Sequence, residues 1–141
     1  MRLVLPIVIL FVFSEIAPRV GAQDHTNQKP AKRNTTYDEI AQAPAKARAK
    51  RNPLESDPDA IAAGRVLFEQ HCQECHGRSA EGAKRGPSLR VEEIQTAEPG
   101  AIFWILSNGV VRRGMPNWSK LPEPQRWALV CFIKSLGNKP G

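Results

Sequence analysis

Apolar residues recur at helical spacing from residue 61 onward, and the first such stretch follows a helix start signal. Asp57 can cap a helix, and Pro58 fits its first position. The residues that then repeat with the period of a helix are Ile61, Gly64, Leu67, Phe68 and His71. Gly64 lowers helix propensity at an interior position, so we expect another element to approach the helix closely there.

Two later stretches also predict helices. One starts at Pro99, carries a dense apolar run and ends at Gly109. The other starts at Pro122 and ends at Gly137, with an inner stripe of Leu129, Phe132, Ile133 and Leu136. A short helix over residues 91–96 is a weaker prediction. No segment alternates apolar and polar residues with the period of two that strands show, so the predicted fold class is all-α, with three to four short helices.

The N-terminus has the pattern of an export signal. Arg2 gives a positive start, residues 3–13 form an apolar run of 11 residues, and residues 20–22 are small ones before a plausible cleavage point. Eleven residues are too few for a membrane-spanning helix, which takes about 20. Residues 1–22 are therefore predicted to be a signal peptide that directs the protein to the periplasm. An uncleaved anchor that faces the periplasm is the alternative.

Residues 23–55 are predicted to be a disordered basic linker rich in Ala, Pro and Lys. Only Tyr37, Ile40 and Leu54 could join a hydrophobic core, which is too little to offset the loss of chain entropy. Residues 23–54 carry seven Lys and Arg against three Asp and Glu. The simpler interpretation is a solvated linker, and the alternative is a tether that rests on an anionic membrane surface or an acidic partner.

The net charge of +6 does not predict a nucleic-acid partner, because most of it lies outside the predicted domain. Residues 55–141 hold 11 Lys and Arg against 10 Asp and Glu, a net charge of +1. We therefore expect a nearly neutral folded domain over residues 56–141, without a groove for nucleic acid.

The chemistry of this domain is indicated by Cys72-Gln73-Glu74-Cys75-His76. Two thiols three residues apart share one face of a helix, so both can reach the two vinyl groups along one edge of a porphyrin. His76 follows directly and can bind the iron, which makes this the attachment signature of a c-type haem. The alternatives are a thioredoxin-like dithiol, which would need a βαβ setting, and a zinc site, which would need a second ligand pair. The third cysteine, Cys131, lies in an apolar run and is predicted to be a small core residue.

The second axial ligand of the iron is predicted to be Met115. It lies 39 residues after His76, in a Gly-Met-Pro loop rather than in the periodic apolar stretch where a core methionine is expected. His25 lies in the predicted linker and His71 directly precedes the haem motif, so neither is expected to reach the other face of the iron.

Four motifs in order resemble the class I cytochrome c family, and within it the small bacterial monohaem members. They are Gly64-x3-Phe68, Cys72-x2-Cys75-His76, Gly86-Pro87-x-Leu89, and Gly114-Met115-Pro116 before a final aromatic-bearing helix. The resemblance covers residues of roughly 57–137. It implies the cytochrome c fold, with helices in an orthogonal arrangement around one covalently attached haem c.

The resemblance also implies particular contacts. The glycine and the phenylalanine of the first motif are implied to cross the C-terminal helix near Leu129 and Phe132. The carbonyl of Pro87 is implied to accept a hydrogen bond from the free ring nitrogen of His76, which would fix the orientation of the ring. Trp118 is implied to contact the haem, either at a propionate or on the face of the porphyrin.

An iron bound by both His76 and Met115 would have no open position, so the predicted function is one-electron transfer between Fe(II) and Fe(III), without enzymatic activity. The carrier would serve a respiratory chain or act as the cytochrome subunit of a dehydrogenase or oxidase. The alternatives are a peroxidase-like haem enzyme with an open distal site and a non-haem metal or dithiol protein. Redox partner proteins are predicted to dock on a small positive ring at the haem edge, with solvated loop charge as the alternative. The residues of this ring are Lys84, Arg85, Arg112 and Arg113.

Overall fold

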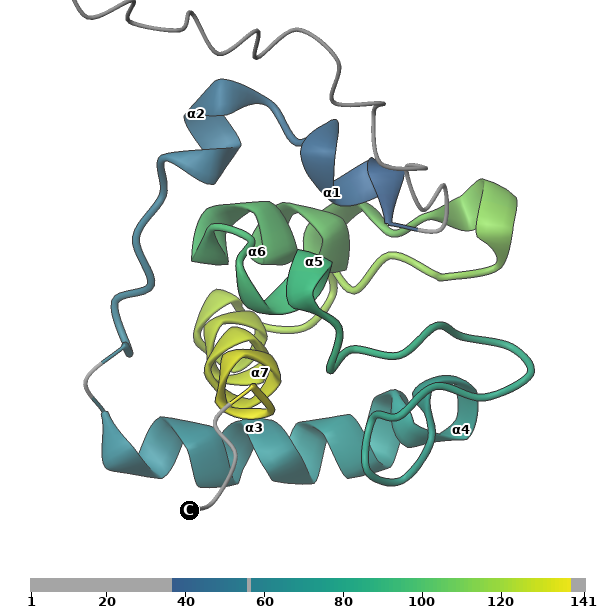
Figure 1. The fold of residues 1–141 in the computed structure, drawn as a ribbon. Coiled ribbons are helices and arrows are strands. Elements are labelled where there is room, and N and C mark those ends of the chain that lie inside the picture. Colours follow the sequence, from purple (N-terminus) through teal and green to yellow (C-terminus); the bar gives the residue numbers. More distant parts are fainter. Residues whose placement is uncertain (1–36, 56, 138–141) are drawn as a thin grey trace, which may run out of the picture. The chain divides into compact units, whose positions relative to one another are not determined.

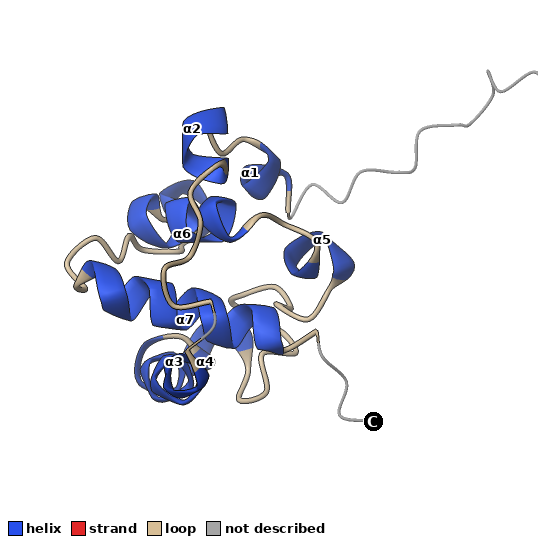
Figure 2. Cartoon of the chain, turned by 90° about the vertical axis from the view of Figure 1, so that its left-hand side faces the viewer, coloured by secondary structure: helices blue, strands red, loops and turns tan. Residues whose placement is uncertain are grey.

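The structure is a computed structural model that describes residues 37–55 and 57–137. The predicted signal peptide and residues 23–36 of the predicted linker lie outside the described residues. The described residues form helices and two isolated β-bridges but no strand (Figure 2). The predicted all-α class is therefore confirmed.

Three longer helices form the frame of the fold, and shorter ones connect or cover them (Figure 1). The helices are α1 (Asp38–Ala41), α2 (Ala45–Arg48), α3 (Pro58–His71), α4 (Gln73–His76), α5 (Glu92–Gln95), α6 (Pro99–Asn108) and α7 (Glu123–Ser135), with a 3₁₀ turn, η1 (Val111–Arg113). The three longer helices, α3, α6 and α7, are those that the hydrophobic pattern predicts. Across the described part of the chain, no helix is both long and apolar enough to cross a membrane.

Helix α3 begins as its sequence predicts. The side-chain carboxylate of Asp57 accepts a hydrogen bond from the backbone N–H of Asp59 at 2.9 Å, and Pro58 occupies the first helical position. Such a cap satisfies one of the otherwise unpaired N–H groups of the first turn. At its other end, α3 is followed by Cys72, and the single turn of α4 begins one residue later.

Helix α7 crosses α3 at Gly64. The two views show this directly, because α7 is seen nearly end-on where α3 is seen along its length, and the turned view reverses the two (Figures 1 and 2). A Cβ atom on Gly64 would collide with the backbone carbonyl of Ala128 and would lie 2.9 Å from Cβ of Phe132. One turn further along, the rings of Phe68 and Phe132 are 5.1 Å apart. The close approach expected at Gly64 is therefore confirmed, and α7 is the element that makes it.

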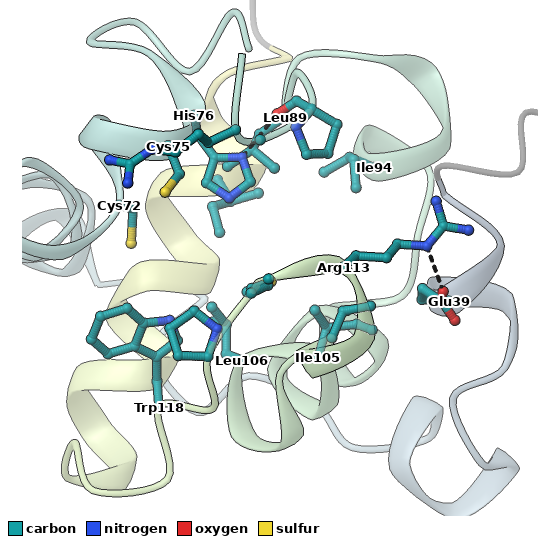
Figure 3. Close-up of a pocket in the computed structure, with 18 of the residues that line it drawn as sticks. Glu39, Cys72, Cys75, His76, Leu89, Ile94, Ile105, Leu106, Arg113 and Trp118 are labelled. Carbon is teal, nitrogen blue, oxygen red and sulfur yellow. Dashed lines mark hydrogen bonds and ion pairs between the residues drawn. The ribbon is translucent and has the colours of Figure 1, made fainter. Parts of the chain in front are cut away.

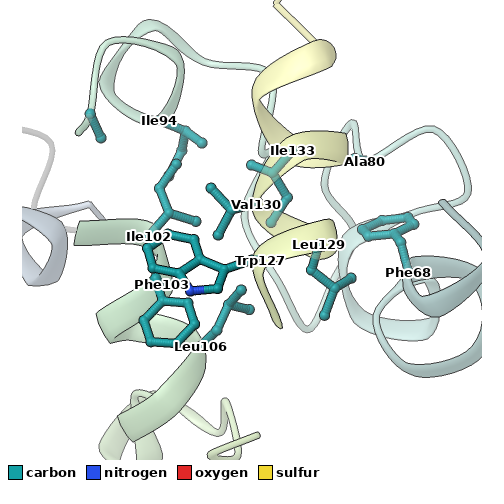
Figure 4. Packing of buried hydrophobic residues seen from close by; sticks show 11 residues of the cluster. Phe68, Ala80, Ile94, Ile102, Phe103, Leu106, Trp127, Leu129, Val130 and Ile133 are labelled. Carbon is teal, nitrogen blue, oxygen red and sulfur yellow. The ribbon is translucent and has the colours of Figure 1, made fainter. Parts of the chain in front are cut away.

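The hydrophobic core lies between α3, α6 and α7 (Figure 4). Phe68, Leu129 and Val130 are completely buried, and the rings of Phe103 and Trp127 stack with their centroids 4.0 Å apart. Burial of a large apolar side chain stabilises the fold by about 1.5–3 kcal/mol. A core of this size is small for a domain, so a large apolar cofactor would add substantially to its stability.

The linker prediction is wrong for residues 37–55, which we call the N-terminal strap. The strap forms α1 and α2 and packs along α6. Helix α6 can be approached this closely because Gly100 has no side chain: a Cβ atom there would lie 2.8 Å from the carbonyl oxygen of Arg48. An ion pair between Arg48 and Glu98, with 3.7 Å between nitrogen and oxygen, joins the same two segments.

The end of the strap is held by one buried polar side chain, Asn52. Its amide nitrogen donates hydrogen bonds to the carbonyl oxygen of Trp127 and to the sulfur of Cys131, both at 3.1 Å. Its amide oxygen accepts a hydrogen bond from the backbone N–H of Leu54 at 2.9 Å. Cys131 is buried, as predicted for a core residue, and burial raises the pKa of its thiol. The strap is therefore ordered by polar anchors and a glycine contact that hydrophobic periodicity does not reveal.

Candidate functional site

A cavity of about 620 Å³ opens between α4 with its following loop and the segment from α6 to Trp118. Its volume falls within the range of ligand-binding cavities, roughly 300–1,000 Å³. Figure 3 shows His76, Cys75 and Leu89 on one side of it and Leu106 and Trp118 on the other. The cavity therefore has two walls that are contributed by segments well separated in the sequence.

The first wall carries the haem-attachment motif. Cys72, Cys75 and His76 all line the cavity, and both cysteines are free thiols. The backbone N–H groups of Cys75 and His76 both donate to the carbonyl oxygen of Cys72, at 3.1 and 3.0 Å, so one tight turn presents all three side chains. Burial, and next the neighbouring Cys75, raise the pKa of Cys72 to about 11. A reactive dithiol needs a thiolate near neutral pH, and Cys72 does not supply one.

The ring of His76 is held by the loop that follows α4. Its Nδ1 lies 2.8 Å from the carbonyl oxygen of Pro87, which is the pair that the family resemblance implies. Gly86 lets the loop come this close, because a Cβ atom there would lie 2.7 Å from the carbonyl oxygen of Cys75. With Nδ1 donating to Pro87, Nε2 is left as the ring nitrogen that can bind a metal.

The second wall contains Met115. Its loop is closed by a β-bridge with Val110, in which the N–H of Val110 donates to the carbonyl of Met115 at 2.9 Å and the N–H of Met115 donates back at 3.2 Å. Gly114 adopts φ 85°, a left-handed conformation that favours glycine, and so allows the turn before Met115. Met115 lines the cavity and is partly buried. Trp118, three residues later, lines the same cavity, and its backbone N–H donates to the backbone carbonyl of Leu106 at 2.8 Å.

The ring of His71 lies near Trp118, although its sequence position beside Cys72 suggests the first wall of the cavity. It also lines the cavity, and its ring centroid is 5.2 Å from that of Trp118, on the segment that carries Met115. The sequence places His71 beside Cys72, but the helical turn at the end of α3 directs its ring toward the opposite wall. The structure thus adds His71 to the residues that line the site.

The four residues of the predicted positive ring do not form a ring of unopposed charges. Arg85 pairs with Glu74. Arg112 and Arg113 both pair with Glu39 of the strap, at 2.5 and 2.9 Å, and the hydrogen bond from Arg112 is the main cause of the lowered pKa of Glu39. Lys84 is exposed. Glu39 was not expected at the site, because 73 residues separate it from Arg112 and no local pattern links them.

The donor set and the walls fit a haem. Two thiols and an imidazole lie on one wall, a thioether lies on the other, and the remaining lining is largely apolar. A zinc site fits less well, since the described residues contain no cluster of three or more His, Cys, Asp or Glu side chains that could hold a metal. An all-helical domain with such a cavity is of the cytochrome c class.

Comparison with known proteins agrees with this class. Residues 59–133, more than half of the chain, match the model of the family described as cytochrome c oxidase, cbb3-type, subunit III. The chain belongs to this family of cytochrome c domains, and haem binding follows from that membership.

Two curated proteins are similar to the chain. It is 29% identical over 106 residues to the cbb3-type cytochrome c oxidase subunit CcoP of Rubrivivax gelatinosus, covering 74% of this chain and 33% of that protein. It is 29% identical over 85 residues to the quinohemoprotein alcohol dehydrogenase ADH IIB of Pseudomonas putida, covering 60% of this chain and 12% of that enzyme. The chain therefore spans a third or less of the length of either relative.

The crystal structure of cytochrome CL from the marine methylotrophic bacterium Methylophaga aminisulfidivorans superposes with a TM-score of 0.54 at 24% identity. The match covers 74% of this chain and 70% of that one. At this level of identity the likeness shows a shared fold, and it confirms the predicted cytochrome c fold.

Proposed function

We propose that the chain is an exported monohaem c-type cytochrome that carries one electron at a time. Cys72 and Cys75 would attach the haem covalently, and His76 and Met115 would bind its iron. One observation supports this most strongly: the attachment motif and Met115, 39 residues apart, line the same cavity, and the imidazole is already oriented by Pro87.

A bound haem would supply the Fe(II)/Fe(III) couple, and the residues of the cavity would set its potential. The hydrogen bond to Pro87 fixes the ring of His76 and makes it a better donor. The thioether of Met115 would favour the reduced iron and raise the potential. The apolar walls exclude water, which disfavours the additional positive charge of the oxidised state.

The relatives suggest the setting in which such a carrier would work. One is a subunit of a cbb3-type oxidase and the other is an alcohol dehydrogenase. We infer that this chain passes electrons to or from a protein complex of this kind, outside the cytoplasm. The basic N-terminal region, which includes the strap, would then bring it close to an anionic membrane surface or an acidic partner.

An optical spectrum of the full chain, produced together with a haem-attachment system, tests the proposal. We expect a covalently bound low-spin haem and, in the oxidised form, a sulfur-to-iron charge-transfer band. A high-spin spectrum that shifts with cyanide or peroxide would instead indicate the peroxidase-like alternative. A colourless protein from cells that mature a control cytochrome would rule out both.

The docking proposal now centres on Lys84, which is exposed and, among the described residues, has no carboxylate paired with it as the three arginines of the predicted ring do. Lys84→Glu should slow oxidation of the reduced protein by the anion ferricyanide, by about threefold at low salt, because the local potential becomes negative. The difference should shrink as salt is added. The cationic oxidant tris(phenanthroline)cobalt should show the opposite change. Lys46→Glu is the matched control, since Lys46 is exposed on α2 and does not line the cavity. Equal rates for the two variants would refute a role for Lys84.

A further inference from the structure

We propose that Glu39 of the N-terminal strap is a positioning residue for Met115, which it holds in place by clamping the turn before it. The inference rests on the proposed His76–Met115 ligation. It concerns a part of the chain that the family match does not reach, because that match begins at residue 59.

Glu39 is an unusually well-covered carboxylate for its position. It lies on the four-residue helix α1 and is only 8% exposed. Arg112 binds it through Nε at 3.2 Å and through Nη2 at 2.6 and 2.5 Å, and Arg113 binds it through Nε at 2.9 Å (Figure 3 shows the Arg113 pair). Charge-assisted bonds of this forked kind fix direction as well as distance. One carboxylate therefore orients two consecutive side chains of η1.

The clamped residues lead directly into the Met115 loop. Arg113 is followed by Gly114 in its left-handed conformation and then by Met115, whose bridge to Val110 closes the loop. Apart from its two chain neighbours, no described residue has a heavy atom within 4 Å of the position of a Cβ on Gly114, so side-chain packing does not restrain this point of the turn. The ion pairs with Glu39 therefore add a side-chain restraint to the backbone hydrogen bonds that Arg113 and Gly114 donate within the turn, at 2.8 and 3.0 Å.

The residue that precedes this short helix contacts the other wall of the cavity. The hydroxyl of Tyr37, immediately before α1, donates a hydrogen bond to the carbonyl oxygen of Ser88 at 3.0 Å. Ser88 follows Pro87, which holds the ring of His76. Tyr37 and Glu39 both line the cavity. The start of the strap thus joins the loop that holds the ring of His76 to the loop that carries Met115, and Glu39 is its link to the Met115 loop.

The test is a competition between Met115 and added imidazole for the oxidised iron in the full-length holoprotein. If Glu39 holds the loop closed, Glu39→Gln removes the charge while keeping the shape, and imidazole should bind about tenfold more tightly, within the usual range of coupling between sites. Disappearance of the sulfur-to-iron band reports the displacement of Met115 directly.

Glu98→Gln is the matched control. It makes the same charge change and removes an ion pair between the strap and the domain, but Glu98 and its partner Arg48 do not line the cavity. Imidazole affinity in this variant should equal that of the wild type. If Glu39→Gln lowers the melting temperature but matches Glu98→Gln in imidazole affinity, Glu39 is only a stabilising residue and the inference fails.

Two further outcomes keep the inference separate from the function on which it rests. Absence of the sulfur-to-iron band in the wild type refutes the proposed ligation itself. If Glu39→Gln does not fold, Arg112→Gln serves instead, since it leaves the pair between Arg113 and Glu39 in place. It should raise imidazole affinity by a smaller factor, about threefold, and an unchanged affinity would overturn the clamp.

Discussion

Replacing Met115 with alanine is expected to abolish the sulfur-to-iron band and to open the iron to added ligands. It should also lower the reduction potential by on the order of 0.1 V or more, within the roughly 0.8 V range over which axial ligands tune haem potentials. The physical reason is the loss of the thioether, which stabilises Fe(II) in preference to Fe(III). Redox titration followed by absorbance measures both effects on one sample.

Met115→His separates the loss of sulfur from the loss of a ligand. It should restore a low-spin spectrum while leaving the potential well below that of the wild type, since a second imidazole replaces the thioether. Survival of the sulfur band in Met115→Ala would show that another residue supplies the sulfur. The axial assignment would then be wrong, although attachment at Cys72 and Cys75 would stand.

Adding a side chain at Gly64 is expected to give the largest loss of stability. We expect Gly64→Ala to lower the free energy of unfolding by about 2 kcal/mol and Gly64→Val by on the order of 4 kcal/mol, out of a typical total of 5–15 kcal/mol. The new atoms would meet the backbone of Ala128, which cannot turn away as a flexible side chain can. Alanine's higher helix propensity, worth about 1 kcal/mol, offsets only part of this cost.

Guanidinium denaturation of the holoprotein measures this loss, and Ala63→Val is its matched control. Ala63 is exposed one position earlier on α3, so added bulk there meets solvent rather than α7. It should cost only the difference in helix propensity, about 0.5 kcal/mol. Comparable losses for Ala63→Val and Gly64→Val would mean that helix propensity, rather than the crossing with α7, explains the glycine.

The frame of the fold could be predicted because its signals are local. The cap at Asp57, the initial prolines of α6 and α7 and the periodic apolar residues each lie within the helix that they predict. The contact at Gly64 could be anticipated as well, because an unfavourable residue within a helix needs a reason. The family resemblance supplied the partner, the C-terminal helix.

The strap could not be predicted, because its few apolar residues, Tyr37, Ile40 and Leu54, pack on the core together with polar contacts that are distant in sequence. Asn52 reaches α7 across 75 residues, and Glu39 reaches Arg112 across 73. The segment does contain few apolar residues, but counting them gives no information about the buried amide of Asn52, whose hydrogen bonds are satisfied. The contact of α2 with Gly100 cannot be predicted from the sequence of the strap either, because the glycine belongs to another helix.

The haem-attachment motif can be recognised from five consecutive residues, whereas the ion pairs around the site cannot be predicted from any local pattern. Arg112 and Arg113 read as free loop charges because their partner lies on α1, far away in the sequence. His71 reads as a neighbour of Cys72, yet its ring lies against Trp118. The residue types allowed haem chemistry to be inferred. The pairing of the charged side chains depends on tertiary contacts that the sequence does not reveal.

The Met115 loop and the crossing of α3 with α7 lie in separate parts of the fold. We therefore expect the two parts to unfold one after the other. The loop is tied down by a two-bond bridge to Val110, the bond from Trp118 to Leu106 and the clamp at Glu39, whereas the crossing is packed around the completely buried Phe68 and Leu129. Segments with few buried contacts open at lower cost than the core. If Met115 binds the iron as proposed, the iron would therefore exchange this ligand while the helices stay folded, and on heating the absorbance of the haem would change before the circular dichroism does.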